Sequence, residues 1–367
     1  MKGIGFVGCG DISGIYLTNI TNLFKELKII GVCDLIHERA EKAAKGYGIN
    51  KIYKDMHELF ADPEVDIVLN ITRPYEHLDV SIAALKAGKH VYSEKPLGAS
   101  LEEAEKIMAL VREKNLYIGG APDTFLGAGL QTCRKLIDDG IIGDIFGASA
   151  YMVCRGHESW HPDPEFYYKY GGGPMMDMGP YYLTALISLL GPVDTVTGMT
   201  KISMPERTIT SMPFNGKVIS VDVPTYVTGL MKFENGAIGT IFTTFDVHTA
   251  QVPRIEIYGS EGTLCVPDPN YFDGPVRFFK GGADDFTEMP LQFEYPENSR
   301  GLGLADMAKA IETGRKNRAN GDVLFHVNEI MSGFHKASDE QSFVKIKSTM
   351  ERPAPMDIPG TKGLFNN

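Results

Sequence analysis

The sequence predicts a chain of two parts: an α/β part built on a doubly wound parallel sheet, then an α+β part with a predominantly antiparallel open sheet covered by helices on one face. In residues 1–121, short apolar segments alternate with helical patterns, as in parallel sheets. After residue 122, hairpin signals replace this alternation. The length of 367 residues also agrees with two domains. We therefore expect domains at residues 1–121 and 122–367.

The first part consists of apolar strands that are each followed by a helix. The expected strands cover residues 3–8, 27–34, 65–72, 89–94 and 116–120. The expected helices begin near Ile12 and cover residues 37–48, 77–88 and 101–115. Strands that are apolar on both faces need cover on both, so this order predicts a parallel sheet between two layers of helices.

The second part changes its pattern. It is expected to begin with a helix over residues 125–140, a strand over 143–154 and a helix over 171–191. Hairpins are expected over residues 226–245, which turn at Asn235-Gly236, and over residues 254–266. Helical patterns follow over residues 303–314 and 322–338. We expect both of these helices to pack onto the antiparallel sheet.

Residues 226–245 also carry apolar side chains on both alternating faces of their hairpin. Helices are expected on only one face of the sheet, which leaves an apolar face uncovered. Such a face usually becomes a subunit interface, so the sequence predicts a homo-oligomer.

Composition excludes several classes of partner. The formal net charge of −11 disfavours nucleic acid and anionic membranes, which need clustered Lys and Arg, so a small molecule is the expected partner. The five cysteines are scattered without a CxxC pair, and no set of His and acidic residues has convincing ligand spacing, so no metal is expected. With no signal peptide and no membrane-spanning segment in the sequence, we expect a cytoplasmic protein.

A glycine fingerprint lies at the first strand–helix junction. Gly8 permits a tight turn, Gly10 lets the backbone approach a pyrophosphate, and the following helix N-terminus favours negative charge. The third position of the fingerprint is Ser13, where Gly or Ala is usual. The expected pyrophosphate contacts are completed by Asp11 and Ile12.

A carboxylate supports this dinucleotide site. Asp34 ends the second strand 21 residues after Ser13, where it can accept hydrogen bonds from both ribose hydroxyls. Leu35 and Ile36 follow, and neither can hold a 2′-phosphate, so NAD is favoured over NADP. Arg39 lies near enough to keep NADP as the alternative. A purely structural alternative is that the glycines make a turn and Asp34 caps the next helix.

The segment ITRPYEHLDVSIAALKAGKHVYSEKPLG, residues 71–98, resembles the Gfo/Idh/MocA family of oxidoreductases. The resemblance is carried by Thr72, Pro74, His77, the run 84–91 and the triplet Glu94-Lys95-Pro96, and it extends to GSEGTL at residues 259–264. It implies an N-terminal Rossmann domain that binds NAD. It also implies that the cofactor site includes Thr72, Arg73, Pro74, His77, Glu94 and Lys95.

The resemblance places Lys95 beside the nicotinamide and in contact with the reacting hydroxyl. A lysine at the carboxyl end of a central parallel strand lies where α/β sheets bind ligands. Desolvation and a nearby nicotinium charge would lower its pKa and make it a usable acid or base. The alternative is a surface lysine at a strand end.

Asp177 is the one carboxylate in the apolar segment 171–191. Members of the family carry D-x-x-x-H here, which implies a catalytic role for Asp177 and for Tyr181, the residue in the place of the histidine. Some sugar oxidoreductases of the family are similar in having tyrosine at this place, and a cation such as Lys95 could lower the pKa of the phenol enough for a proton relay. The alternative is that Asp177 caps a helix that begins near Met178, with Pro180 in its first turn and Tyr181 in the core.

Residues 154–173, the aromatic loop, concentrate aromatic and histidine side chains. Aromatic faces pack against sugar C–H groups, although such loops also build oligomer interfaces. The candidate substrate-binding residues are Asp123, Thr124, His157, Trp160, His161 and Arg300. His326 lies in an apolar helical pattern and is expected to be a hydrogen-bonded core residue.

These features predict a NAD-dependent oxidoreductase that oxidises a ring secondary hydroxyl of a sugar, glycoside or cyclitol to the ketone, reversibly. Two alternatives stay open. One is an enzyme that recycles bound NAD within each turnover, either between two sugars or in glycoside cleavage. The other is a dinucleotide-sensing binding protein without catalysis.

Overall fold

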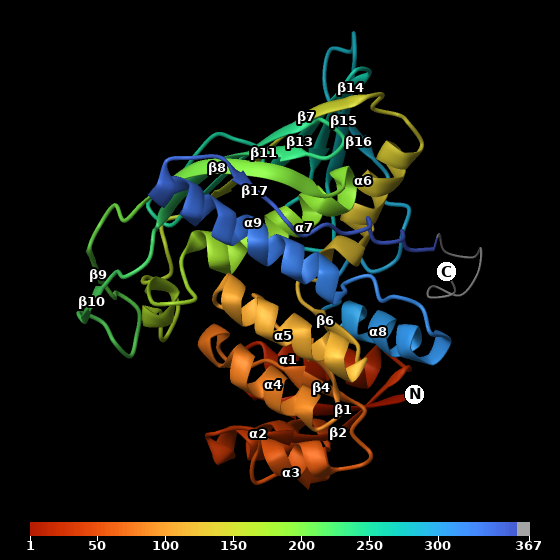
Figure 1. Ribbon diagram of the computed structural model, residues 1–367, viewed down its shortest axis with the longest axis vertical. Helices are drawn as coiled ribbons and strands as arrows, with labels where there is room; N and C mark the ends of the chain where they lie inside the picture. The colour runs from red at the N-terminus through yellow and green to blue at the C-terminus, as the bar shows by residue number, and fades with distance from the viewer. Residues whose placement is uncertain (358–367) are drawn as a thin grey trace.

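The computed structural model describes residues 1–357, which contain two main sheets (Figure 1). The first sheet has the strand order β3-β2-β1-β4-β5-β6, and all its strands are parallel. Its strands are β1 (Lys2–Val7), β2 (Leu27–Cys33), β3 (Lys51–Ile52), β4 (Ile67–Asn70), β5 (His90–Ser93) and β6 (Ile118–Gly120). Its helices are α1 (Ser13–Asn22), α2 (His37–Tyr47), α3 (Met56–Ala61), α4 (His77–Lys86) and α5 (Leu101–Lys114). The predicted doubly wound parallel sheet is confirmed.

Two elements of this sheet were not expected from the sequence, the strand β3 and the helix α3. Both are too short to show a period: β3 has two residues and α3 has six. Local chemistry fixes α3, because the Asp55 side chain accepts the backbone N–H groups of His57 and Glu58.

The second sheet has nine strands in the order β16-β15-β14-β13-β7-β12-β11-β8-β17. Neighbours run antiparallel except β7 and β12, which are parallel, and β9 pairs with β10 in a separate ribbon. The strands are β7 (Ile145–Val153), β8 (Val193–Lys201), β9 (Glu206–Thr208), β10 (Val218–Ser220), β11 (Tyr226–Phe233), β12 (Ile238–Thr244), β13 (Ile255–Gly259), β14 (Gly262–Val266), β15 (Val276–Lys280), β16 (Thr287–Met289) and β17 (Val344–Lys345). Both expected hairpins, β11–β12 and β13–β14, are confirmed.

Helices cover one face of this sheet, as predicted. They are α6 (Ala128–Asp138), α7 (Pro174–Leu190) and α9 (Gly321–Glu340), which Figure 1 shows between the two sheets. Side chains of β11 alternate strictly between exposed and buried. Met199, Leu230 and Ile238 are exposed. The hairpin thus carries apolar residues on both faces, but only the residues on one face are buried in the core.

The helix α8 (Leu302–Thr313) packs against β6 of the parallel sheet, so the expectation that it packs onto the antiparallel sheet was wrong. The cause lies just after β6, where the Asp123 carboxylate accepts the backbone N–H groups of Gly301 (2.9 Å) and Gly303 (3.0 Å). These two N–H groups lie at the N-terminus of α8, so the carboxylate holds the start of the helix at the parallel sheet. The expectation is right for α9, which packs mainly on β8.

The edge of β6 is also closed by residues from far along the chain. Asn317 donates to the Ile118 carbonyl (3.4 Å), the Gly120 amide donates to the Ala319 carbonyl (3.2 Å), and Gly119 forms an isolated bridge with Asn320. We propose residues 1–121 and 122–367 as the domains, with the segment around α8 completing the first sheet. Among residues 1–357, no helix combines the length and the apolar character that crossing a bilayer requires.

Candidate active site

The glycine loop after β1 leaves room for a ligand at one position and for none at another. Gly8 has φ 101°, and a Cβ there would lie 2.8 Å from the Ile71 carbonyl oxygen, so only glycine fits. A Cβ on Gly10 would meet no heavy atom within 4 Å. Ile12, before the first turn of α1, supplies no side-chain cap. Open space over Gly10 and an uncapped helix start suit a pyrophosphate, so these residues fit a dinucleotide.

Asp34 is joined to this loop. Its Oδ2 accepts the Cys9 amide at 2.6 Å and its Oδ1 accepts the Ile36 amide at 2.7 Å. These bonds fix the carboxylate at the end of β2, where the sequence places a ribose contact. Burial raises the pKa of Cys9 to about 12, so its thiol stays neutral beside this carboxylate.

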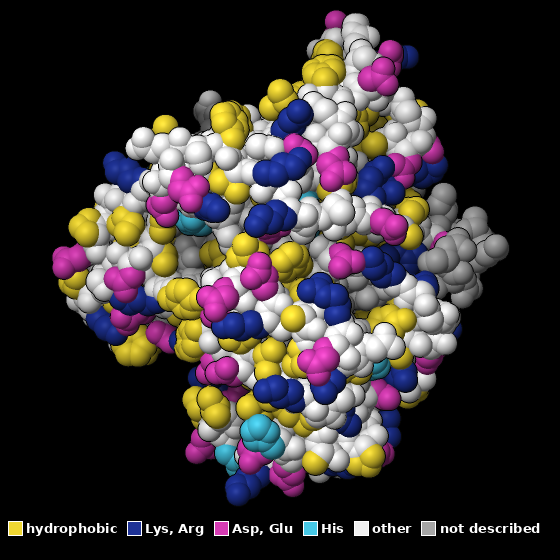
Figure 2. Space-filling model, in the orientation of Figure 1, with side chains coloured by type: hydrophobic (Ala, Val, Ile, Leu, Met, Phe, Trp, Pro, Cys, Tyr) yellow, Lys and Arg dark blue, Asp and Glu magenta, His cyan; other side chains and the backbone are white. Residues whose placement is uncertain are grey.

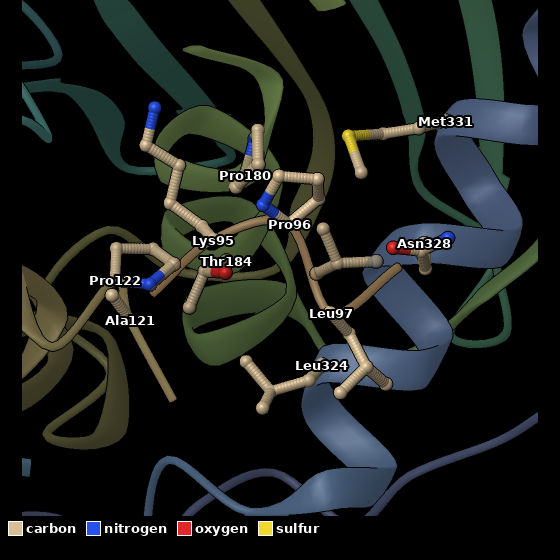
Figure 3. Close-up of a pocket in the computed structure, with 11 residues that line it drawn as sticks. Lys95, Pro96, Leu97, Ala121, Pro122, Pro180, Thr184, Leu324, Asn328 and Met331 are labelled. Carbon is tan, nitrogen blue, oxygen red and sulfur yellow. The ribbon is translucent and has the colours of Figure 1, made fainter. Parts of the chain in front are cut away.

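Lys95 and Asp177 form a buried ion pair. The Lys95 Nζ donates to Asp177 Oδ1 at 2.5 Å and to the Asp177 carbonyl at 2.6 Å, and it lies 5.4 Å from the centre of the Tyr181 ring. The two charged side chains are 16% and 12% exposed. Figure 3 shows Lys95, which follows β5, beside Pro180 and Thr184, with Asn328 and Met331 of α9 on the other side. The sequence-predicted trio of Lys95, Asp177 and Tyr181 is therefore brought together.

Asp177 does not cap its helix. The helix α7 begins at Pro174, the Asp177 amide donates to the Gly173 carbonyl at 2.9 Å, and Pro180 lies inside the helix. The capping alternative, which placed the helix start near Met178, was wrong. Because Lys95 takes one carboxylate oxygen, the charge in this apolar helix is explained by pairing.

The direction of the Lys95 pKa differs from the expected one. Burial alone would lower it, but Asp177 and Tyr181 favour the ammonium form, and the pKa lies above its ordinary value. For Tyr181, burial raises the pKa, and the opposing effects of Lys95 and Arg300 are smaller. Lys95 is therefore an ammonium and Tyr181 a neutral phenol at neutral pH.

The aromatic loop brings His157 next to the pair. The His157 Nε2 lies 3.6 Å from Asp177 Oδ2, and its ring stacks on Tyr167 with 3.9 Å between centroids. His161 lies against the same tyrosine, with its Nδ1 accepting the Asp163 amide at 3.0 Å. Trp160 is 63% exposed. His157 thus lies deep in the site, whereas Trp160 lies at its rim.

A second group of predicted residues connects the loop after β4 to the site. Arg73 pairs with Asp163 of the aromatic loop at 2.7 Å and lies over the ring of Phe166. His77 is fully buried, and its ring nitrogens face the carbonyls of Thr72 (3.2 Å) and Pro96 (2.8 Å). Pro74 starts a short 3-10 helix at this point. His77 therefore holds the Thr72 and Pro96 segments together instead of presenting a free donor.

Glu94 precedes Lys95 and supports it. Its Oε1 accepts the Tyr16 hydroxyl at 2.8 Å and its Oε2 accepts the Lys95 amide at 3.1 Å. The backbone at Lys95 is thus fixed from two sides, which leaves its side chain aimed at Asp177.

The remaining predicted substrate-binding residues are Asp123, Thr124 and Arg300. Asp123 and Thr124 are almost fully buried, and burial raises the pKa of Asp123 to about 6. Arg300 donates to the Asn270 side chain at 2.8 Å, and its charge acts on Tyr181. Asp123 is occupied with the start of α8, so Arg300 is the one of these three with a direct electrostatic link to the trio.

Sequence reasoning missed a buried cluster behind the aromatic loop. The Arg207 guanidinium donates to Glu158 at 2.6 Å and pairs with Asp246, and Glu158 also accepts the Tyr168 hydroxyl. Arg207 is 4% exposed. We call Arg207, Glu158, Asp246 and Tyr168 the arginine cluster. One arginine in a β-rich segment carries no sequence signal, because its partners are distant in the chain.

Two small pockets meet at Lys95 and Pro96. One lies between α7 and α9, as Figure 3 shows, and includes Thr184, Asn328 and Met331. The other lies beneath the aromatic loop and is lined by Pro74, Lys95, Pro96, Phe166, Tyr167, Gly171, Gly172, Met176 and Asp177. Within residues 1–357, no three His, Cys, Asp or Glu side chains gather as a metal site would require.

Comparison with known families gives two matches in chain order. Residues 2–119 match the oxidoreductase family with an NAD-binding Rossmann fold, and residues 130–265 match the GFO/IDH/MocA C-terminal domain. Together the two family models span most of the chain.

Curated relatives are dehydrogenases. The chain is 25% identical over 262 residues to a myo-inositol 2-dehydrogenase of Thermotoga maritima, covering 71% of this chain and 74% of that one. It is 26% identical over 264 residues to a levoglucosan dehydrogenase of Pseudarthrobacter phenanthrenivorans, covering 67% of each. A scyllo-inositol 2-dehydrogenase (NAD(+)) of Bacillus subtilis is 26% identical over 310 residues, with 84% and 86% coverage.

Solved structures agree in fold. Levoglucosan dehydrogenase in its apo form superimposes with a TM-score of 0.81 at 21% identity, covering 95% of this chain and 99% of that one. Its complex with NADH gives 0.79. The matched family models, the dehydrogenase relatives and the glycine loop lead to one conclusion: this chain belongs to the Gfo/Idh/MocA family and is an NAD-dependent oxidoreductase.

Proposed function

We propose that this protein is a dehydrogenase that oxidises a ring secondary hydroxyl of a sugar, glycoside or cyclitol to the ketone, reversibly. The observation that carries the proposal is the buried pair of Lys95 and Asp177 at the carboxyl end of the parallel sheet. An ion pair with a purely structural role would not need an ammonium group that borders two pockets. The inositol and levoglucosan substrates named for the relatives are ring polyols, which supports this class.

The cofactor site would be built from three segments. Gly8, Gly10, Asp11, Ile12 and Ser13 would hold the pyrophosphate, and Asp34 the ribose. The segment with Thr72, Arg73 and Pro74, and that with Glu94, would border the nicotinamide end. Bound NAD supplies the hydride acceptor, and every proton is handled by side chains of this chain.

Lys95 would contact the reacting oxygen and stabilise negative charge as the hydroxyl ionises. Because Lys95 rests as an ammonium, it must release a proton to Asp177 Oδ1 before it can accept the hydroxyl proton. Tyr181 and Arg300 border this group, and His157, His161 and Trp160 would contact the sugar ring.

The test is a panel of inositols, anhydrosugars, pyranoses and glycosides supplied with NAD to the purified protein. NADH absorbance is expected to rise with at least one of them. In the alternative outcome, NADH absorbance stays constant with every substrate while the protein keeps a tightly bound dinucleotide and transfers a hydrogen label from one sugar to another. That result would favour the enzyme that recycles its cofactor. Dinucleotide binding without reaction would favour the sensing protein.

We also propose a homo-oligomer formed through the open face of the mixed sheet, where Met199, Leu230 and Ile238 are exposed. Figure 2 shows further hydrophobic side chains on the lobe that carries β9 and β10, and Lys, Arg, Asp and Glu interspersed over the visible face. A concentration-independent monomer mass in light scattering would contradict this assembly. The five cysteines are free thiols, which supports a reducing, cytoplasmic setting.

A further inference from the structure

His157 contacts the half of the Asp177 carboxylate that Lys95 leaves open. Lys95 Nζ lies 2.5 Å from Oδ1, and His157 Nε2 lies 3.6 Å from Oδ2. The carboxylate therefore stands between an ammonium and an imidazole. Distances between groups that handle protons are often long before substrate binds, so 3.6 Å is compatible with a hydrogen bond in the working complex.

The imidazole ring is held mainly by contacts with aromatic rings. It is 8% exposed, lies parallel to Tyr167 within 13°, and meets Phe245 edge to face at 4.6 Å. Its Nδ1 is buried and has no hydrogen-bond partner among residues 1–357. The carboxylate favours the tautomer with hydrogen on Nε2, which leaves the Nδ1 lone pair open to a proton.

The backbone that carries the ring is fixed by the arginine cluster. The His157 amide donates to the Tyr168 hydroxyl at 3.3 Å, and the next side chain, Glu158, is bound by Arg207. The Glu158 carbonyl also accepts the amides of Thr210 (2.8 Å) and Ser211 (3.0 Å). The position of His157 relative to Asp177 is thus determined by contacts of its own backbone and of the next residue.

The charged groups around the ring oppose one another. Burial lowers its pKa, Asp177 of α7 raises it, Lys95 beyond β5 and His161 of its own loop lower it, and Glu158 raises it. The result lies below the ordinary value, so the ring is neutral at pH 7. A proton added at lower pH would place a second positive charge against the same carboxylate.

We propose that His157 is a positioning residue for the Lys95–Asp177 pair: its Nε2–H holds Asp177 Oδ2 while the ring is neutral, and protonation of the ring impairs the pair. This inference rests on the proposed dehydrogenase function. In the oxidation direction, the Lys95 proton would move to Asp177 Oδ1 and the hydroxyl proton would move to Lys95, which leaves one excess proton on Asp177 for release to solvent, while bound NAD would supply the hydride acceptor. An imidazolium on Oδ2 makes Asp177 a weaker proton acceptor and slows the first of these transfers.

The first test compares His157→Gln with His157→Leu in the oxidation direction. Glutamine keeps an N–H donor but cannot titrate, so the fall of kcat at acidic pH should disappear, and His157→Gln should lose less kcat than His157→Leu. Leucine removes the donor and should lower kcat about tenfold without changing the KM for NAD. An unchanged acidic fall in His157→Gln, or full activity in His157→Leu, would overturn the proposal.

The second test needs no turnover and separates this inference from the proposed function. The imidazole C–H signal of His157 is assigned in the proton NMR spectrum as the signal that is missing in His157→Gln. That signal is then titrated with pH in the wild type and in Asp177→Asn. Removing the carboxylate charge should lower the titration midpoint of that signal further below the ordinary value. The same midpoint in both proteins would show that the two groups are not coupled, even if no substrate is found.

Discussion

The arginine cluster and the Lys95–Asp177 pair are both buried ion pairs, but their hydrogen bonding differs. The Arg207 guanidinium donates to two carbonyls and two carboxylates, and Asp246 accepts the Thr225 hydroxyl at 2.8 Å as well. Among residues 1–357, the Lys95 ammonium donates hydrogen bonds only to Asp177, and it lies over the Tyr181 ring. A planar guanidinium with many partners holds the surrounding structure rigid. An ammonium that still has an unused N–H can bind a ligand.

The largest effect is expected from Arg207→Met, which removes the buried cation that Glu158 and Asp246 share. The free energy of unfolding should fall by about 3–5 kcal/mol, measured by chemical denaturation. Lys135→Met, which breaks an exposed pair with Asp139, should cost less than about 1 kcal/mol. Equal losses in the two variants would mean that the arginine cluster does not lock the fold.

Lys95→Ala should act mainly on turnover, although it also leaves the Asp177 carboxylate without its cation. We expect kcat to fall at least about 10²-fold, the usual scale for a positioned acid or base, with little change in NAD affinity. Lys106→Ala, at an exposed pair on α5, is the matched control and should keep wild-type turnover. If Lys95→Ala kept most of its turnover, the lysine would have only a structural role.

The buried residues His157 and His326 extend the same comparison. His326 has both ring nitrogens occupied, by the Val193 amide at 2.9 Å and the Ser348 hydroxyl at 2.8 Å, which agrees with the expected core role. Burial lowers its pKa to about 4, so between that value and its ordinary value the unfolded state binds more protons than the folded state.

Stability should therefore fall as pH decreases through this window, and the His326 contribution should amount to about 2 kcal/mol between pH 7 and pH 5. Denaturation at the two pH values, in wild type and His326→Gln, measures the difference between their pH slopes. Parallel slopes would show that His326 titrates alike in the folded and unfolded states.

The smallest effect is expected from Tyr181→Phe, which keeps the ring under Lys95. The raised pKa of Tyr181 argues for cation–π support of the lysine, so kcat should fall less than about fivefold. Tyr181→Leu removes the ring and should lower kcat further. A loss in Tyr181→Phe as large as in Lys95→Ala would instead assign proton relay to the hydroxyl.

The sequence was sufficient to predict the doubly wound parallel sheet, both hairpins and the meeting of Lys95 with Asp177. These depend on local periods, turn residues and family motifs, which are visible in one chain. Helical periodicity shows that α8 has a buried face but not which sheet buries it. In the same way, the sign of the Lys95 pKa shift depends on the 2.5 Å contact with Asp177, a distance that spacing along the chain cannot give.

The late closure of β6 has a consequence for synthesis of the protein. Asn317 and Ile118 are 199 residues apart, so the ribosome must add about 200 residues before the edge of the first sheet is covered. At common elongation rates this takes roughly 10 to 40 s. During that interval residues 1–121 present an open strand edge, the kind of surface on which chains aggregate. The topology therefore calls for protection of this edge during synthesis, for example by chaperones.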